Sequence, residues 1–410
     1  MRNCVDLPQM PAEAGALMQG TGPAAVSGFL GVPDALTGGC QPDGADGAVR
    51  PSAGGHGSTP VPGMRVLAWP AKAAHNPYNG LLYDGLRALG VDVVEFTPFR
   101  LVGRPGTIWH LHWVEAKWNR PRVGEAAFRA AAILAMLQFA RLRGVRIVWT
   151  VHNLQAHERY HPRLERWFWR AFISRVDGYL ALSAAGKALA RERFPRLRTV
   201  PGFVVPHGHY RDAYPATLTR EEARARLGVP AEARVVAFLG KIRPYKNVPH
   251  LIRTLRTLTD PSLRLLVAGQ PNLPRLADDV RAAVGDDPRI RLWLEHVPDD
   301  EVQVYLGAAD LVVLPYQEVL NSGSALLALS FDRPVLVPER GAMGELAARV
   351  GADWVRTFTG SLSPAALDDA VQWARAPRAA GCEGLRTLSW AQIARETLDS
   401  FECVVRGTSR

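Results

Sequence analysis

A glycine and three cations stand close together near the middle of the 410-residue chain. Gly240, Lys241, Arg243 and Lys246 follow the apolar run 235–239, and the segment after them carries apolar residues at helical spacing. This pattern predicts a buried parallel strand, a turn and a helix. Glycine allows close backbone approach, and a helix start favours negative charge. The turn therefore suits a phosphate or diphosphate, although basic loop residues are more often simply solvated.

Composition and charge restrict the class of protein. The chain is 47% hydrophobic and carries a formal charge of +10. Its length predicts two or three domains with substantial cores, and its charge suits nucleic acid, an anionic membrane or an anionic small substrate. The four cysteines form no CxxC motif, so we expect a reducing cytosol and neither a disulfide framework nor a zinc site.

The first 63 residues differ from the rest of the chain. They contain 13 of the 37 glycines and 8 of the 31 prolines, with few bulky apolar residues. Such a segment cannot offset its ordering entropy by burial, so we expect a disordered extension, or sequence upstream of the true start at Met64. It lacks the pattern of a secretory signal. No apolar run reaches transmembrane length, and the longest, 130–140, is expected to be a packed helix.

Strand-like and helix-like segments alternate from residue 64 onward. The first series has apolar runs at 65–69, 91–96, 107–113, 145–151 and 178–182, with helical patterns at 81–89, 125–143 and 163–175. A second series has apolar runs at 235–239, 263–268, 290–294, 311–315 and 334–337. The alternation predicts an α/β fold with two doubly wound, Rossmann-like domains facing a cleft. We expect domains at 64–215 and 216–385, and a C-terminal helix within 386–410 that packs back across the join.

Short motifs in a particular order resemble the group-one superfamily of GT-B glycosyltransferases, which use nucleotide-diphosphate sugars. The resemblance covers residues 64 to about 401. The motifs are Asn79-Gly80, T-V-H-N at 150–153, V-P-H-G-H at 205–209, Gly240-Lys241 with Lys246, V-A-G at 267–269, A-A-D-L-V-V-L-P at 308–315, R-P-V-L at 333–336 and the segment 341–346. Each motif alone is weak, whereas their order and spacing are fairly specific.

The resemblance implies a donor site in the second domain. Gly240, Lys241, Arg243 and Lys246 would hold the diphosphate, Gly80 would lie in a glycine loop beside it, and no bound metal ion is expected. A predicted helix start at Asn321, Ser322, Gly323 and Ser324 would present N–H and hydroxyl groups to the β-phosphate or the sugar. Glu345 would touch the donor, or would be an ordinary helix-start carboxylate.

One departure concerns the two glutamates that retaining members carry eight positions apart. Leu327 takes the place of the second, and Glu318 stands near the first, one position off. The segment 316–327 more closely resembles the bacterial exopolysaccharide β-mannosyltransferases, which use GDP-mannose and invert the anomeric centre. The sequence leaves stereochemistry and ribose recognition open.

Histidines follow the predicted fourth strand and the join between the domains. His152 ends the strand facing the cleft, where ligands of open α/β sheets bind, and it could contact the donor hexose. Glu158 or His157 is a candidate general base that would take the proton of the acceptor hydroxyl. His207 and His209 are hinge or acceptor-side residues, and a purely structural hinge is an equal alternative.

Aromatic and basic residues are mixed between 163 and 175. Trp167, Phe168, Trp169 and Phe172 lie among Arg166, Arg170 and Arg175. The mixture suits the headgroup region of an anionic bilayer and hence a lipid-linked acceptor. An ordinary helix–sheet core with solvated arginines is slightly favoured.

The sequence thus predicts a hexosyltransferase that moves a sugar from a nucleotide-diphosphate donor, GDP-mannose first, to a glycan or lipid-linked glycan in polysaccharide biosynthesis. We expect a cytoplasmic protein, either free or peripheral at the inner face of the membrane. A sugar-nucleotide epimerase on the same fold is an alternative, disfavoured because no paired catalytic carboxylates stand in suitable loops. A basic nucleic-acid-binding protein is another, but it lacks a recognisable motif, and no nucleic-acid partner is expected.

Overall fold

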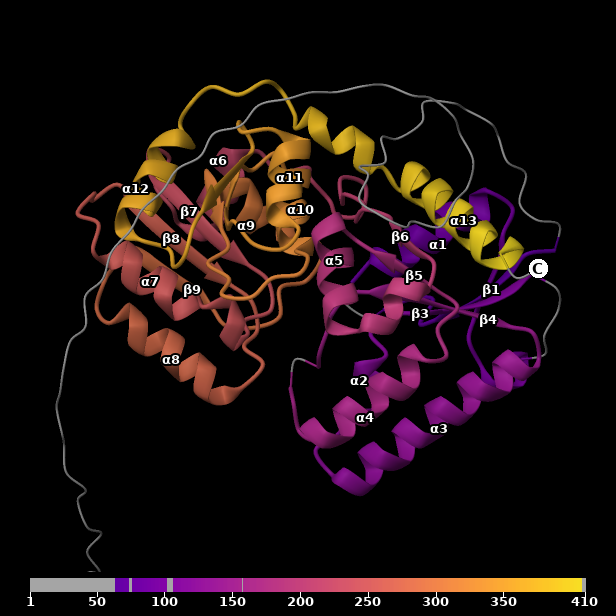
Figure 1. Ribbon diagram of the computed structural model, residues 1–410. Coiled ribbons are helices and arrows are strands. Elements are labelled where there is room, and N and C mark those ends of the chain that lie inside the picture. The colour runs from indigo at the N-terminus through magenta and orange to yellow at the C-terminus, as the bar shows by residue number, and fades with distance from the viewer. Residues whose placement is uncertain (1–62, 74–75, 102–105, 157, 408–410) are drawn as a thin grey trace, which may run out of the picture. The chain divides into compact units, whose positions relative to one another are not determined.

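The computed structural model describes residues 63–73, 76–101, 106–156 and 158–407. The disorder predicted for residues 1–63 therefore lies, except for Gly63, outside the described part. Twelve strands in the described residues form two parallel six-stranded sheets (Figure 1). The first contains β1 (Arg65–Trp69), β2 (Asp92–Glu95), β3 (Thr107–Leu111), β4 (Arg146–Val151), β5 (Gly178–Ala181) and β6 (Gly202–Val204), in the order β2-β1-β3-β4-β5-β6.

The second sheet is also parallel and six-stranded, but two strands, rather than one, lie beyond the first strand of its series. It contains β7 (Arg234–Leu239), β8 (Leu263–Ala268), β9 (Ile290–Trp293), β10 (Leu311–Val313), β11 (Val335–Pro338) and β12 (Val355–Phe358), in the order β12-β11-β10-β7-β8-β9. In both sheets the strand order reverses beside the first strand of the series, which leaves a crevice at the carboxyl ends of the strands. The predicted fold of two doubly wound sheets is confirmed.

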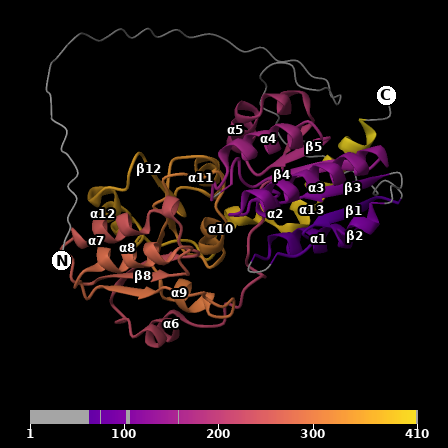
Figure 2. The same ribbon diagram turned by 90° about the horizontal axis from the view of Figure 1, so that it is seen from below.

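Helices connect the strands and cover the sheets. The first series has α1 (Tyr78–Ala88), α2 (Glu115–Trp118), α3 (Val123–Leu142), α4 (Pro162–Ile173) and α5 (Ala184–Arg193). The second has α6 (Arg220–Leu227), α7 (Val248–Arg256), α8 (Pro274–Val284), α9 (Val302–Ala308), α10 (Gly323–Ser330), α11 (Met343–Val350) and α12 (Pro364–Trp373), and α13 (Trp390–Arg406) ends the described chain. Figure 2 shows α7 and α8 on one side of β8, and α6 and α9 on the other.

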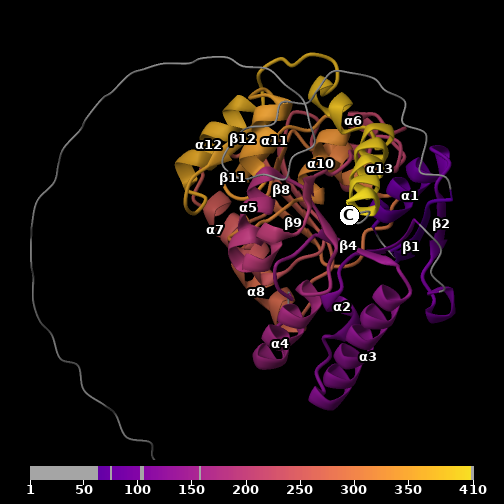
Figure 3. The ribbon, with the colours of Figure 1, turned by 45° about the vertical axis from the view of Figure 1, so that its right-hand side comes forward.

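The two faces of the first sheet are covered by different parts of the chain. Successive strand residues point to opposite faces, so Leu67 packs with α3 and α4, whereas Val66 and Ala68 pack with α1 and α13. Figure 3 shows these two helix pairs on opposite sides of the strands. Ile393 and Phe401 of α13 are fully buried there. The end of the chain therefore completes the core around the first sheet.

The largest difference from the sequence prediction is at Gly80. We expected a glycine loop after the first strand, but Gly80 lies in the first turn of α1, which begins at Tyr78 rather than at residue 81. The helix starts earlier because Tyr78 and Leu82 both pack into the core. A Cβ atom at Gly80 would meet nothing within 4 Å, so neighbouring atoms do not require glycine there.

Candidate active site

Two glycine turns bring the ends of β7 and β8 into backbone contact. Gly240 and Gly269 have φ angles of 126° and 145°, which side chains rarely adopt. A Cβ atom at Gly269 would lie 2.2 Å from the carbonyl oxygen of Gly240. A Cβ atom at Gly240 would lie 3.2 Å from Ser324 Oγ and 3.5 Å from Lys246 Nζ. The structure thus brings Gly240, Ser324 and Lys246 together at the carboxyl edge of the second sheet.

Lys246 is a buried cation in this turn. Its side chain lies over two aromatic rings, with Nζ 5.7 Å from the centre of Phe238 and 5.3 Å from that of Tyr316, and the residue is only 8% exposed. No carboxylate of the described residues pairs with it. Burial lowers the pKa of Lys246 to about 8. A cation held without a counter-ion in a low-dielectric site is suited to binding an anion. Lys241, by contrast, is exposed.

The loop before α10 supplies polar groups. Ser322 caps the helix, because its Oγ accepts a hydrogen bond from Ala325 N at 3.2 Å. The amide nitrogen and oxygen of Asn321 are both buried and have no hydrogen-bond partner in the described part of the chain. A buried amide without partners is costly, so Asn321 is suited to a polar ligand. A Cβ atom at Gly323 would lie 3.3 Å from Tyr210 Oη and 3.7 Å from His207 Nε2.

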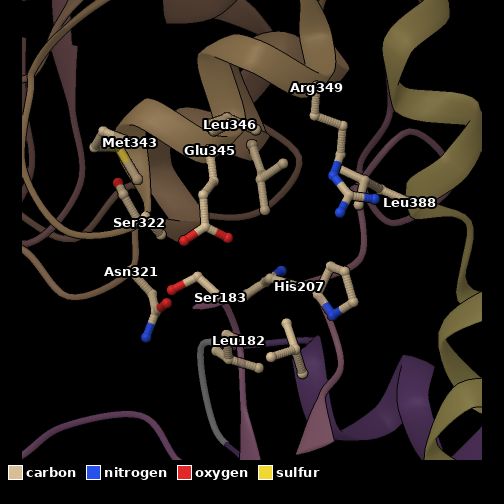
Figure 4. A pocket seen from close by; sticks show the side chains of 14 residues that line it. Leu182, Ser183, His207, Asn321, Ser322, Met343, Glu345, Leu346, Arg349 and Leu388 are labelled. Atoms are coloured by element: carbon tan, nitrogen blue, oxygen red, sulfur yellow. The ribbon is translucent and has the colours of Figure 1, made fainter. Parts of the chain in front are cut away.

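A cavity of about 60 Å³ lies between the end of the first sheet and helices α10 and α11. Figure 4 shows Glu345 pointing toward Ser183, with Asn321 and His207 on either side. Ligand pockets for small molecules usually measure roughly 300–1,000 Å³, so this cavity can enclose only part of a nucleotide sugar in the conformation described. Glu345 caps α5, since its carboxylate accepts the N–H groups of Ala184 at 2.9 Å and Ala185 at 2.6 Å.

The predicted histidines gather around Tyr78. The ring of His152 stacks on Trp113, with centres 4.1 Å apart, and the centre of the Tyr78 ring lies 5.1 Å from that of His152 and 4.7 Å from that of His207. Burial lowers the pKa of His152 well below its usual value and that of His207 to about 4. Both rings are therefore neutral at physiological pH.

His207 and His209 make different contacts. His207 Nδ1 donates to the carbonyl oxygen of Gly208 at 2.7 Å, so its Nε2 accepts from Tyr210 Oη at 3.2 Å. His209 contacts the C-terminal segment through backbone atoms. The N–H of His209 donates to the carbonyl oxygen of Leu388, and the carbonyl oxygen of His209 accepts from Trp390 Nε1 at 2.6 Å. His209 thus has a clear structural role, whereas His207 lines the cavity.

Glu158 lies against the turn after β7. Its carboxylate pairs with Arg243 Nη1 at 3.4 Å and accepts from Asn272 Nδ2 at 3.3 Å. The Glu158 side chain is 40% exposed and that of Arg243 20%. The candidate base thus pairs with one of the candidate diphosphate cations. His157 lies outside the described residues, and His161 donates to the backbone oxygen of Arg120.

Several polar residues near the site were not predicted from the sequence. His110 and His112 are buried on β3 and just after it, and Asn272 carries a buried amide oxygen without a partner in the described region. Glu115 is buried beside Asn153, whose Nδ2 donates to it at 2.8 Å, and burial raises the pKa of Glu115 to about 7. The spacing of His110 and His112, two residues apart at the end of a strand, is the signal that could have revealed them.

Comparison with known proteins gives independent information. A family model described as "Glycosyltransferase Family 4" matches residues 76–208, and one described as "Glycosyl transferases group 1" matches residues 233–374. The GDP-mannose:glycolipid 4-beta-D-mannosyltransferase of Xanthomonas campestris pv. campestris is 33% identical over 323 residues, which are 78% of this chain and 85% of that protein.

Solved structures share the fold at low identity. A sucrose-phosphate synthase of Thermosynechococcus elongatus has a TM-score of 0.60 and 17% identity, and covers 84% of this chain and 100% of its own. The Anabaena protein HepE, in complex with UDP and glucose, has a TM-score of 0.54 and 15% identity, and covers 84% and 98%. With both halves matched by family models and a relative of 33% identity, the chain belongs to the group 1 glycosyltransferases and is a glycosyltransferase of the GT-B fold.

Proposed function

We propose that this glycosyltransferase moves a hexose from a nucleotide-diphosphate sugar to a glycan or lipid-linked glycan, with mannose from GDP-mannose as the first candidate. The buried Lys246, which pairs with no carboxylate among the described residues, carries the proposal, because developing diphosphate charge is stabilised by preorganised cations in a dry site. The name of the Xanthomonas relative supports the choice of GDP-mannose and of a glycolipid acceptor. A role in polysaccharide biosynthesis follows from that acceptor class.

The donor site is proposed at the ends of β7 and β10. Lys246, Arg243 and Lys241 neutralise the diphosphate, so the reaction requires no metal ion. Further donor contacts are assigned to Gly80, Gly240, Asn321, Ser322, Gly323, Ser324 and Glu345. The unpartnered amide of Asn321 supports this assignment most directly. Glu345 reaches the donor only if it leaves the N-terminus of α5, which it caps in this conformation.

The acceptor hydroxyl must lose a proton as it attacks the hexose. We assign Glu158 as the base in an inverting course. Its carboxylate pairs with Arg243 in the described conformation. A bound diphosphate that attracts Arg243 would release this carboxylate, and the proton of the acceptor hydroxyl could then pass to it while the bond between C1 and the phosphate oxygen breaks.

Thermal unfolding with a panel of nucleotides tests the donor assignment. GDP-mannose and GDP are expected to raise the melting temperature more than UDP-glucose, UDP, GMP or free mannose, because a ligand that binds only the folded state stabilises it. GDP release should then require a lipid-linked glycan acceptor. Absence of a shift with every nucleotide sugar and diphosphate would contradict the proposal. Interconversion of nucleotide sugars without an acceptor would indicate an epimerase instead.

The outer face of α3 supports a membrane-bound acceptor. Phe128, Phe139 and Leu142 are 75%, 51% and 76% exposed, and together with the exposed Ala131 and Ala135 they recur at helical spacing along one stripe. The helix extends well beyond the apolar run 130–140 and, contrary to the expectation from the sequence, it is long and apolar enough to cross a membrane by length and composition. Its opposite face, however, packs in the core through residues such as Ala130 and Leu137. A helix that packs one face into the core and exposes an apolar face to solvent is suited to lying on a bilayer surface.

Exposed basic residues lie on α4, the helix that packs beside α3. On α4, Arg163, Arg166 and Arg170 share the exposed face with Trp167, which is 50% exposed. The three arginines pair with no carboxylate in the described part of the chain. Phe168, Trp169 and Phe172 of the same helix are buried in the core, as the simpler reading of the sequence expected. Charge complementarity favours an anionic bilayer, so we propose peripheral contact at the cytoplasmic face of the membrane.

The double substitution Phe128→Glu with Leu142→Glu is expected to reduce binding to vesicles of phosphatidylcholine and phosphatidylglycerol by about tenfold or more, because two apolar side chains lose their burial and two negative charges are added. Co-sedimentation measures this, and binding to phosphatidylcholine alone should be weak. Leu273→Glu, at a half-exposed leucine that precedes α8, is the matched control. Equal loss in the control, or unchanged binding in the double variant, would contradict the proposed surface.

A further inference from the structure

A chain of hydrogen bonds connects the buried core of the first sheet to His152. Thr150 Oγ1 lies 2.7 Å from His110 Nε2, and His110 Nδ1 lies 2.9 Å from Tyr83 Oη. Tyr83 Oη lies 2.8 Å from His112 Nε2, and His112 Nδ1 lies 2.8 Å from His152 Nε2. The first four residues are fully buried, and only His152 is partly exposed.

The five side chains contain five exchangeable protons for four hydrogen bonds when each ring is neutral. Burial lowers the pKa of His110 to about 3 and that of His112 well below its usual value, so the rings are neutral. A neutral imidazole has one N–H donor and one acceptor nitrogen. The Tyr83 oxygen can accept two hydrogen bonds but donate only one, so the chain has three consistent arrangements, in which the fifth proton is left on His152, on Thr150 or on Tyr83.

The three arrangements differ in cost. In one, the hydroxyl of Thr150 donates to His110 and every later bond follows the same direction, so the fifth proton is on Nδ1 of His152, at the exposed end. In the second, the Thr150 hydroxyl proton has no acceptor, since Thr150 is fully buried and His110 is its one side-chain partner in the described residues. In the third, Tyr83 accepts from both His110 and His112, and its own buried hydroxyl proton has no acceptor among the described side chains. An unpartnered buried hydroxyl costs free energy. The first arrangement is therefore favoured.

We propose that Thr150, His110, Tyr83 and His112 are positioning residues that fix the proton of His152 on Nδ1, so that His152 donates a hydrogen bond to the sugar nucleotide and does not take the acceptor's proton. This inference rests on the proposed function for the identity of the ligand. The stack of His152 on Trp113 fixes the plane of the ring. The direction of the hydrogen-bond chain then determines which ring atom is the donor.

Nitrogen-15 NMR of the full-length protein labelled at histidine tests the proposal without any substrate. The His152 signals, assigned by their loss in His152→Gln, should show a protonated Nδ1 and a bare Nε2 in the wild type. Thr150→Val and Tyr83→Phe should each produce a mixture of the two tautomers, and Thr150→Ser should restore the single one. Tyr179→Phe, which removes a buried hydroxyl that accepts from Arg191, is the matched control and should change nothing.

A proton on Nε2 in the wild type, or an unchanged tautomer in Thr150→Val, would overturn the proposal. Thr150→Val differs little in volume from the wild type, so the proposal remains testable if Tyr83→Phe does not fold. With the nucleotide sugar found by the thermal screen, Thr150→Val should lower kcat about threefold to tenfold, and Thr150→Ser should not. If that screen fails while the NMR result holds, the donor assignment is wrong and the positioning role stands.

Discussion

Lys246→Met is expected to weaken binding of GDP and GDP-mannose by at least about a hundredfold, because a buried anion would lose the cation that pairs with it. The folded protein should be no less stable. The lysine already lacks a carboxylate partner in the described part of the chain, and methionine keeps most of its contact with Phe238 and Tyr316. Removing an unpaired buried charge relieves a desolvation cost. Isothermal titration calorimetry measures the affinity, and thermal unfolding without ligand measures the stability.

Lys241→Met is the matched control, because Lys241 lies in the same turn but is exposed, where charge interactions are weak. Its effect on affinity should be less than about tenfold. If Lys246→Met bound GDP and GDP-mannose as tightly as the wild type does, the proposed diphosphate site would be refuted. Loss of affinity together with unfolding would instead identify Lys246 as a structural residue.

The pH dependence of binding provides a second test of Lys246. Burial lowers the pKa of the free enzyme's lysine to about 8, and a bound diphosphate raises it, since an opposite charge favours the protonated form. The affinity for GDP and GDP-mannose should therefore be highest below pH 8. It should fall as the pH rises through 8, by up to about tenfold per pH unit. Lys246→Met should lack this fall between pH 8 and 9. A wild-type affinity that rises with pH there would contradict the assignment.

The sequence predicted most of the fold because buried parallel strands are continuous apolar runs. The strands at 65–69 and 263–268 were predicted at the bounds the structure gives. The predicted run 107–113 ends instead at Leu111, because the backbone of Trp113 turns at a φ angle of 43°. Strands β6 and β12 were not predicted. Each lies at the edge of a sheet, and β6 has three residues and starts at a glycine, so neither resembles a core strand.

Candidate site residues could be predicted from the sequence where they directly follow a strand, as His152 and Gly240 do. The residues that they contact could not be predicted, because those contacts join distant parts of the chain. Glu158 and Arg243 are 85 positions apart, and Glu345 contacts the start of α5 160 positions earlier. Glu115 was not predicted, because its position in the first turn of α2 does not reveal that its side chain is buried. Only tertiary packing determines which carboxylate is paired, buried or open to a ligand.

His152→Ala is expected to lower kcat by about a hundredfold to a thousandfold, the usual cost of removing one preorganised donor that acts in the transition state. The affinity for GDP should change little, because GDP lacks the hexose that the ring is proposed to contact. Steady-state kinetics with GDP-mannose and an acceptor measure kcat, and calorimetry measures GDP binding. A large loss of GDP affinity would instead place His152 at the diphosphate.

Comparison with two further variants separates a hydrogen-bond donor from a proton acceptor. His152→Gln keeps an N–H donor near the position of the ring, so it should recover part of the activity lost in His152→Ala. Glu158→Gln keeps the volume but removes the proposed base, so kcat should fall by about a hundredfold or more. If His152→Gln were as inactive as His152→Ala while Glu158→Gln kept its activity, His152 would be the base. The hydrogen-bond chain through His112 would then run in the opposite direction, with the proton of His152 on Nε2.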